Sequence, residues 1–173
     1  PEYVDRFKEF GITILQGYGM TECSPVISSN LEWANKKGSV GKLMPNCQAK
    51  VVDDELWVKG SSVMLGYYKM PQETAETLED GWLKTGDLGY VDEENYVYIT
   101  GRKKNLIILA NGENVSPEEL ENHLNRDERI KEILVRDKNG VIEAEIFPDM
   151  EYAQKAGISN IQEELQKVID EFN

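Results

Sequence analysis

Between residues 40 and 100 the sequence runs in short apolar segments with turn residues between them, and this spacing constrains the fold more than any other feature. QAKVV and ELWVK are five residues long, and the second alternates apolar and polar side chains as a half-buried strand does. LGYVDEENYVYIT holds two such segments around an acidic turn with an asparagine, which predicts a hairpin. We therefore expect a small, distorted antiparallel sheet or barrel in this region.

The segments beside this region complete a mixed pattern of helices and strands. PEYVDRFKEFG carries apolar residues on one helical stripe and ends in glycine, so we expect a helix there. PQETAETL opens with proline, which is typical of the first position of a short helix. Three further apolar runs are too short for helices and are predicted to be strands: ITILQ, PVISS and VMLGYY.

The sequence changes character at GRKKN, where a glycine and three positive charges follow the predicted hairpin. The next helix has the clearest start signal in the chain. Ser116 is a candidate N-cap, Pro117 takes the first helical position, and Glu119 lies three residues past the cap. This pattern predicts a capping box with a proline start.

A strand pair and a final helix follow. IKEILVR and VIEAEIFP predict two strands around a glycine turn, and the last segment repeats apolar residues on one helical face. The expected fold class is therefore α+β, in two parts. Residues 1–101 would be the tail of a large domain, ending in the small barrel, and residues 102–173 an incomplete, smaller α+β domain.

The charge balance excludes some partners. Among 173 residues, 32 are acidic and 19 basic, giving a formal net charge of −13 at pH 7. Such a surface repels nucleic acid, so we expect no nucleic-acid partner. No apolar run reaches the length of a bilayer, although a longer parent protein could touch a membrane peripherally. Cys23 and Cys47 show no ligand-pair spacing; we expect reduced, structural thiols and a cytoplasmic protein.

The stretch GYGMTE, Gly17 to Glu22, combines features suited to a nucleotide. Its glycines let a ligand approach the main chain, and the hydroxyl of Thr21 can bind a phosphate oxygen. The carboxylate of Glu22 would lie beside phosphate only with a divalent cation between them, and Mg²⁺ prefers one or two carboxylates plus phosphate oxygens. The alternative is a hairpin turn with a surface carboxylate.

Two later motifs carry further polar groups. Asp87 lies between two glycines in DGWLKTGDLG, where a carboxylate could accept hydrogen bonds from a ribose diol or simply bond its own turn. Arg102 offers a planar fork of donors, and Lys104 a flexible point charge; alternatively, this basic cluster is a solvated face. ANGEN is a glycine turn between the apolar run and the helix, and it could be only a connection.

Together these motifs resemble one family. GYGMTE, then GYY with DGWLKTGD, then GRKKNLIILANGENVSPEELE, in this order, are similar to the later motifs of the adenylate-forming (AMP-binding) superfamily. The similarity runs from about Phe10 to Leu124 and is greatest to acyl-CoA synthetases, the long-chain fatty acid–CoA ligase branch in particular. Peptide-synthetase domains usually have an arginine-bearing turn where this chain has NGENV.

The resemblance implies an activity and a set of ligands. Family members use ATP to convert a carboxylic acid to an acyl-adenylate and then pass the acyl group to CoA. Thr21 would hold the α-phosphate and Glu22 would bind Mg²⁺. The adenine and part of the acyl pocket would be bordered by Gln16, Gly17, Tyr18 and Gly19.

The resemblance also assigns roles at and beyond the end of the barrel. Asp87 would bind the ribose hydroxyls, and Arg102 would strengthen this binding. Lys104 occupies the family's hinge position, around which the small domain turns between the two half-reactions. Gly112 and Glu113 would belong to the face that meets CoA.

Two family motifs are not in this sequence: the upstream phosphate loop and the downstream catalytic lysine. Asp54 also stands where a glycine is typical. We therefore expect part of an ATP-dependent fatty-acid–CoA ligase of fatty acid metabolism, inactive alone, with ATP, Mg²⁺, CoA and a fatty acid as ligands. The alternatives are an aryl-CoA or acyl-ACP synthetase, or a non-catalytic module that keeps the fold.

Overall fold

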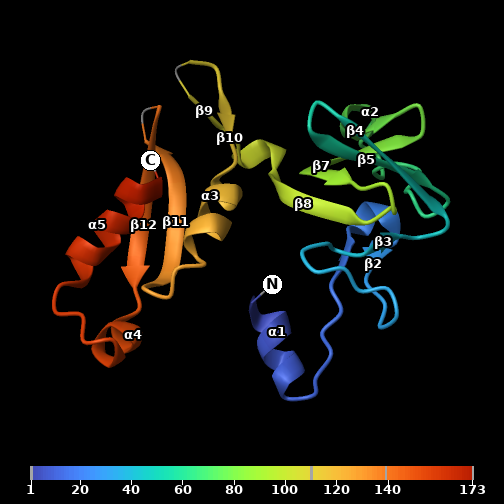
Figure 1. Cartoon of the computed structure of the whole chain (residues 1–173). Coiled ribbons are helices and arrows are strands. Elements are labelled where there is room, and N and C mark those ends of the chain that lie inside the picture. The colour runs from blue at the N-terminus through green and yellow to red at the C-terminus, as the bar shows by residue number, and fades with distance from the viewer. Residues whose placement is uncertain (1, 110, 139, 173) are drawn as a thin grey trace. The chain divides into compact units, whose positions relative to one another are not determined.

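The computed structural model describes residues 2–109, 111–138 and 140–172. It divides the chain into two compact units, Pro1–Lys103 (unit 1) and Lys104–Asn173 (unit 2), each containing helices and antiparallel strands (Figure 1). The expected α+β class is therefore confirmed.

Unit 1 is built around a curled, five-stranded antiparallel sheet in the order β4-β5-β7-β6, with β8 also pairing with β7. One face of this sheet is the core, because the side chains of Leu56, Val58, Leu83 and Val97 are completely buried there. The predicted hairpin is confirmed as β7 and β8. The strands are β4 (Cys47–Val52), β5 (Glu55–Gly60), β6 (Leu78–Glu79), β7 (Trp82–Val91) and β8 (Val97–Arg102).

A smaller sheet, β1-β2-β3, packs its apolar side chains into the same core. Ile27 of β2 is completely buried, and Cys23, just before it, is buried beside Cys47. The predicted helices at the N-terminus and after Met70 are both present. The remaining elements of unit 1 are α1 (Glu2–Glu9), β1 (Gly17–Gly19), the 3₁₀ turn η1 (Thr21–Cys23), β2 (Val26–Ser29), β3 (Lys42–Leu43) and α2 (Pro71–Thr77).

Two strand predictions in unit 1 are wrong. Residues 12–16 (ITILQ) have an irregular backbone, and β1 begins only at Gly17, where pairing with β2 starts. Residues 63–68 (VMLGYY) form bends and irregular backbone instead of a strand. A strand-like sequence forms a strand only where a neighbouring strand can pair with it. Neither segment has such a neighbour among the described residues. Leu65 is fully exposed as a result.

The β4–β5 hairpin closes with a two-residue turn, since Val52 pairs with Glu55. Both turn residues have left-handed backbones, with φ of 50° at Asp53 and 62° at Asp54. Such turns favour glycine, above all at the second position. This explains why a glycine is the typical residue where Asp54 stands.

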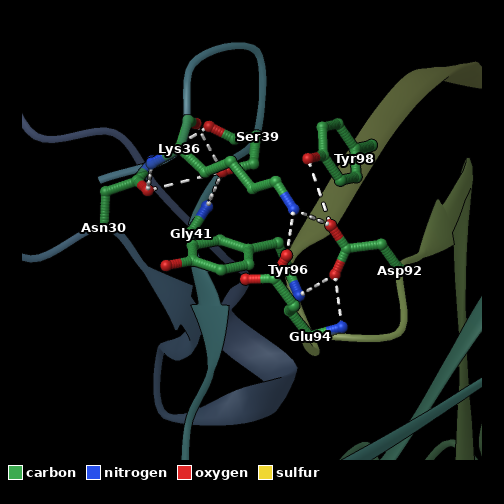
Figure 2. A network of polar contacts seen from close by, with 8 residues as sticks. All are labelled: Asn30, Lys36, Ser39, Gly41, Asp92, Glu94, Tyr96 and Tyr98. Carbon is green, nitrogen blue, oxygen red and sulfur yellow. Dashed lines mark hydrogen bonds and ion pairs between the residues drawn. The ribbon is translucent and has the colours of Figure 1, made fainter. Parts of the chain in front are cut away.

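A polar network ties the β2–β3 loop to the β7–β8 turn (Figure 2). The ammonium of Lys36 lies 2.7 Å from Asp92 Oδ2, and the backbone N–H of Lys36 donates to Asn30 Oδ1 at 3.0 Å. Asp92 Oδ1 also accepts from the backbone N–H of Glu94 and Tyr96 at 3.0 and 2.9 Å. The network therefore links the small sheet to the large one through these two connections.

Unit 2 has an eight-pair antiparallel hairpin, β11–β12, whose apolar side chains pack against two helices. Leu124, Ile133, Val135 and Leu165 are among its buried residues. The predicted strand pair and final helix are confirmed. The 3₁₀ turn η2 (Lys103–Asn105) spans the boundary between the units. The elements of unit 2 are β9 (Ile107–Ile108), β10 (Asn114–Val115), α3 (Pro117–Leu124), β11 (Ile130–Lys138), β12 (Val141–Pro148), α4 (Met150–Lys155) and α5 (Ile161–Phe172).

The start of α3 is only partly as predicted. Ser116 is the N-cap and Pro117 the first helical residue, but the Ser116 side chain makes no capping hydrogen bond. Its hydroxyl donates instead to Glu118 Oε2 at 3.1 Å. The capping box is therefore not formed, because the carboxylate two residues on competes successfully for the hydroxyl.

Candidate functional site

Asp87 and Arg102 face each other across β7 and β8, and Arg102 Nε lies 2.7 Å from Asp87 Oδ1. Their alignment depends on a register shift in the hairpin. Val91 pairs with Val97 and Gly89 with Ile99, but Leu88 pairs with Gly101, so one extra residue is accommodated on β8. Because side chains alternate between the faces of a strand, this bulge brings Arg102 to the face that carries Asp87.

Tyr18 of β1 completes this cluster from the other sheet. Its hydroxyl donates to Asp87 Oδ2 at 2.5 Å. Burial of the phenol, followed by the hydrogen bond to Asp87, raises the pKa of Tyr18 far above its ordinary value, so the group stays a neutral donor. The backbone N–H of Asp87 donates to Thr85 Oγ1 at 3.1 Å, within β7.

The cluster can hold a diol. Asp87 is only 4% exposed, whereas about half of the Arg102 side chain is accessible. Asp87 Oδ2 accepts a hydrogen bond from Tyr18 and Oδ1 forms an ion pair with Arg102, whereas a carboxylate has about four acceptor positions. The free lone pairs and the outer N–H groups of Arg102 suit the two hydroxyls of a ribose.

Glu22, the candidate magnesium ligand, lies in η1. Its Oε1 accepts a hydrogen bond from the Tyr67 hydroxyl at 2.8 Å, and its carbonyl accepts from the backbone N–H of Met64. This contact raises the pKa of Tyr67. Mg²⁺ binds one or two protein carboxylates plus phosphate oxygens, so a single oriented carboxylate, whose Oε2 has no partner among the described residues, fits such an ion. Thr21, one residue earlier, is exposed.

Lys104, Gly112 and Glu113 belong to unit 2 and are all exposed. Gly112 has a left-handed backbone, with φ of 84°, in the turn between β9 and β10. Glu113 bonds back to Asn111, its N–H donating to Asn111 Oδ1 at 3.0 Å. The described residues therefore bring Tyr18, Asp87 and Arg102 together in unit 1 and form a separate turn in unit 2.

Comparison with known proteins agrees with these motifs. The family described as AMP-binding enzyme matches residues 1–68. The long-chain-fatty-acid–CoA ligase of Bacillus subtilis (strain 168) is 44% identical over 141 residues, covering 74% of this chain and 25% of that protein. The chain belongs to the AMP-binding enzyme family. The resemblance identified from the motifs is confirmed.

Solved structures of other proteins superpose on the fold of this chain. O-succinylbenzoate coenzyme A synthetase (MenE) from Bacillus subtilis, in complex with ATP and magnesium ion, superposes with a TM-score of 0.72 at 34% identity, covering 84% of this chain and 34% of that chain. The anthranilate CoA ligase AuaEII, in complex with anthranoyl-AMP, gives 0.71 at 27% identity, covering 84% and 31%. The chain spans about a quarter of the length of the curated relatives it matches.

Two residues that the sequence analysis missed form hydrogen bonds to the site or beside it. One is Tyr67, which orients Glu22. The other is Glu55, a 4% exposed carboxylate at the start of β5. Its Oε1 accepts from the backbone N–H of Gly86 at 2.9 Å, and its Oε2 lies 2.8 Å from the ammonium of Lys103. A glutamate leading an apolar strand was the only signal in the sequence.

The pKa of Glu55 shows how its contacts outweigh its burial. Burial alone pushes this pKa up, but the Lys103 ammonium and the Gly86 N–H together hold it below the ordinary value. Glu55 is therefore ionised in the folded AMP-binding family chain. A buried charge of this kind needs both partners, and removing either leaves it poorly compensated.

Gly19, the second glycine of GYGMTE, allows β1 and β2 to approach closely. A Cβ on Gly19 would lie 2.0 Å from the carbonyl oxygen of Pro25, so β1 and β2 could not approach as they do. The carbonyl of Gln16 accepts a hydrogen bond from the backbone N–H of Asn30 at 2.8 Å. These contacts fix the strand that presents Tyr18.

The cysteines of this AMP-binding family chain are both free and buried, as expected of structural thiols. Burial, with smaller contributions from Cys47 and Glu22, raises the pKa of Cys23 to about 11. No helix within the described residues is long and apolar enough to cross a membrane. The same residues include no cluster of three or more histidine, cysteine or acidic side chains that could hold a metal ion alone.

Proposed function

We propose that this chain is the adenosine-binding part of an ATP-dependent, AMP-forming acid–CoA ligase whose acid is a long-chain fatty acid. The observation that carries the proposal is the buried Asp87 carboxylate, fixed between Tyr18 and Arg102 with accepting positions left over. The curated relatives named long-chain-fatty-acid–CoA ligase support the choice of acid. We assign residues 1–101 to the large domain and residues 102–173 to the small one.

In the first half-reaction, the carboxylate of the acid attacks the α-phosphorus of ATP, and the bond to pyrophosphate breaks. Asp87 and Arg102 hold the ribose, and the main chain from Gln16 to Gly19 borders the adenine. Thr21 donates to an α-phosphate oxygen, and Glu22 is the residue that would bind Mg²⁺. The ion, when bound, neutralises the negative charge that gathers on the phosphate oxygens.

In the second half-reaction, the thiol of CoA attacks the acyl carbonyl and AMP leaves. Lys104 begins unit 2 and is the proposed hinge for the change between the two steps. Gly112 and Glu113 form an exposed turn that would meet CoA. The exposed position of this turn suits contact with a second substrate.

An aryl acid is the second candidate substrate class. The similar solved structures include MenE and an anthranilate CoA ligase, and both names specify aromatic acids. Pyrophosphate exchange by the full-length protein, screened over long-chain fatty acids and aromatic acids, separates the candidates. Acid-dependent exchange with fatty acids is expected; exchange with aromatic acids alone would replace the proposed substrate, and no acid-dependent exchange would refute the ligase assignment.

A further inference from the structure

Glu55 contacts two segments that the sequence separates. It starts β5, and its carboxylate accepts the N–H of Gly86, which lies 31 residues away and immediately precedes Asp87. The same carboxylate pairs with Lys103, which lies 48 residues away and immediately follows Arg102. One buried group is thus attached next to each of the two residues proposed to bind ribose.

The contact of Glu55 with Lys103 lies at the boundary between the two units. Lys103 is the last residue of unit 1, and Lys104 is the first of unit 2. The main chain at this point is a 3₁₀ turn, η2, an element that is common as a connector. A side-chain contact at Lys103 therefore acts on the main chain at the boundary between the two units.

We propose that Glu55 is a positioning residue, which clamps the part of β7 that carries Asp87 and the last residue of unit 1 into one body, so that rotation of the main chain begins at Lys104. The link to nucleotide rests on the proposed function, because only a bound ribose gives the alignment of Asp87 with Arg102 its purpose. The clamp itself is a property of unit 1.

The carboxylate of this pair is buried and held from two sides, while half of the Lys103 side chain is exposed. Glu55 is 4% exposed and has a backbone donor on one oxygen and an ammonium on the other. The contact with Glu55, opposed in part by burial, raises the pKa of Lys103, and Asp53 on the neighbouring turn adds to the same effect. A pair of this kind is lost only when the ammonium moves, since its carboxylate is held by Gly86.

The test is a measurement of backbone ¹⁵N relaxation on the full 173-residue chain and four variants, one of them a control. Lys103→Met removes the ammonium, Lys103→Arg keeps a cation, and Glu55→Gln removes the buried charge. Glu79→Gln is the control, because Glu79 pairs with Lys84 at 2.7 Å in the same sheet, whereas the Gly86 N–H bonds to Glu55. Amide hydrogen exchange at Gly86 is recorded in parallel.

In the unmodified chain we expect an order parameter of about 0.85 at residues 102 and 103. Lys103→Met should lower it below about 0.6 at both residues while Gly86 stays protected, and Lys103→Arg should restore it. Glu55→Gln should also speed Gly86 exchange by about tenfold or more. An unchanged order parameter at residue 103 in Lys103→Met would overturn the clamp. So would an equal fall of this order parameter in Glu79→Gln.

Titration of each sample with AMP separates the clamp from the proposed function. If the clamp and the function both hold, AMP shifts the amides of β7 and β8 in the unmodified chain and shifts them less in Lys103→Met. If AMP shifts none of these amides while the order at Lys103 depends on Glu55, the ribose role fails and the clamp stands. If AMP binds equally to all variants, the clamp does not serve the nucleotide.

Discussion

The hydroxyl of Tyr18 donates a 2.5 Å hydrogen bond to Oδ2 of Asp87, although the two residues lie 69 positions apart. This contact joins the small sheet to the large one at the point where Arg102 reaches the same carboxylate. A nearly buried acid is therefore fixed from both sides before any ligand arrives. Preorganised groups of this kind add to affinity because little ordering is left to do on binding.

Tyr18→Phe should lower the free energy of unfolding of the chain by about 1–3 kcal/mol, because Asp87 would keep its burial and lose a donor. Urea denaturation measures this change. Tyr68→Phe is the matched control, since that side chain is 85% exposed, and it should change stability by less than about 0.5 kcal/mol. Equal effects of the two variants would mean that the Tyr18 hydroxyl contributes nothing to the fold.

The sequence predicted elements whose signals are local and missed features that depend on register. The β7–β8 hairpin and α5 follow from alternation and helical periodicity, and both are present. ITILQ has the composition of a strand, but pairing begins only at Gly17. Composition cannot supply a neighbouring strand, and this is why the prediction failed.

The candidate site was predictable to a similar degree. Motifs indicated Asp87 and Arg102, but their alignment depends on a bulge in β8 that no turn signal specifies. Glu55 and Tyr67 act through contacts with residues 31 and 45 positions away, which only the folded chain brings together. Long-range polar contacts leave no periodic trace in a sequence.

Asp54→Gly should stabilise the chain by up to about 1 kcal/mol, because a left-handed residue with φ of 62° loses its Cβ strain. Asp54→Ala tests the same position without that relief and should stabilise nothing, since alanine keeps a Cβ at positive φ. Thermal unfolding followed by circular dichroism compares the two. A lower midpoint for the glycine variant than for the alanine variant would contradict the turn assignment.

Acid should weaken the network of Figure 2 through Asp92. The hydrogen bond from Lys36 is the largest cause that lowers the pKa of Asp92 to about 2, against about 4 for an unfolded chain. A depressed carboxyl pKa stabilises the fold fully above about pH 4, and the contribution disappears as the pH falls toward about 2. Asp92→Asn should therefore remove part of the loss of stability over this range.

The measurement is the urea midpoint of the unmodified chain and Asp92→Asn at several acidic pH values. Glu93→Gln, at an exposed neighbouring position, is the control and should keep the acid sensitivity of the unmodified chain. If Asp92→Asn loses stability as steeply as the unmodified chain on acidification, the Lys36 contact does not govern the response.

Lys104→Pro should separate the two half-reactions in the full-length protein. Proline fixes φ and restricts rotation at the proposed hinge, so thioester formation should fall by about tenfold or more, while adenylate formation is spared. Pyrophosphate exchange measures the first step and single-turnover transfer to CoA the second. Lys104→Ala, which leaves the backbone free, should retain both; equal loss of both steps in the proline variant would place the hinge elsewhere.

The most direct test of the central claim, that the cluster of Tyr18, Asp87 and Arg102 holds the ribose of ATP, is the ATP dependence of pyrophosphate exchange in Asp87→Ala. Loss of charge-assisted hydrogen bonds to the ribose should raise the apparent KM for ATP by about 10- to 100-fold, with the KM for the acid nearly unchanged. Asp87→Asn keeps one acceptor oxygen, so its apparent KM for ATP should lie between those of the unmodified protein and Asp87→Ala. An ATP dependence equal to that of the unmodified protein would contradict the account.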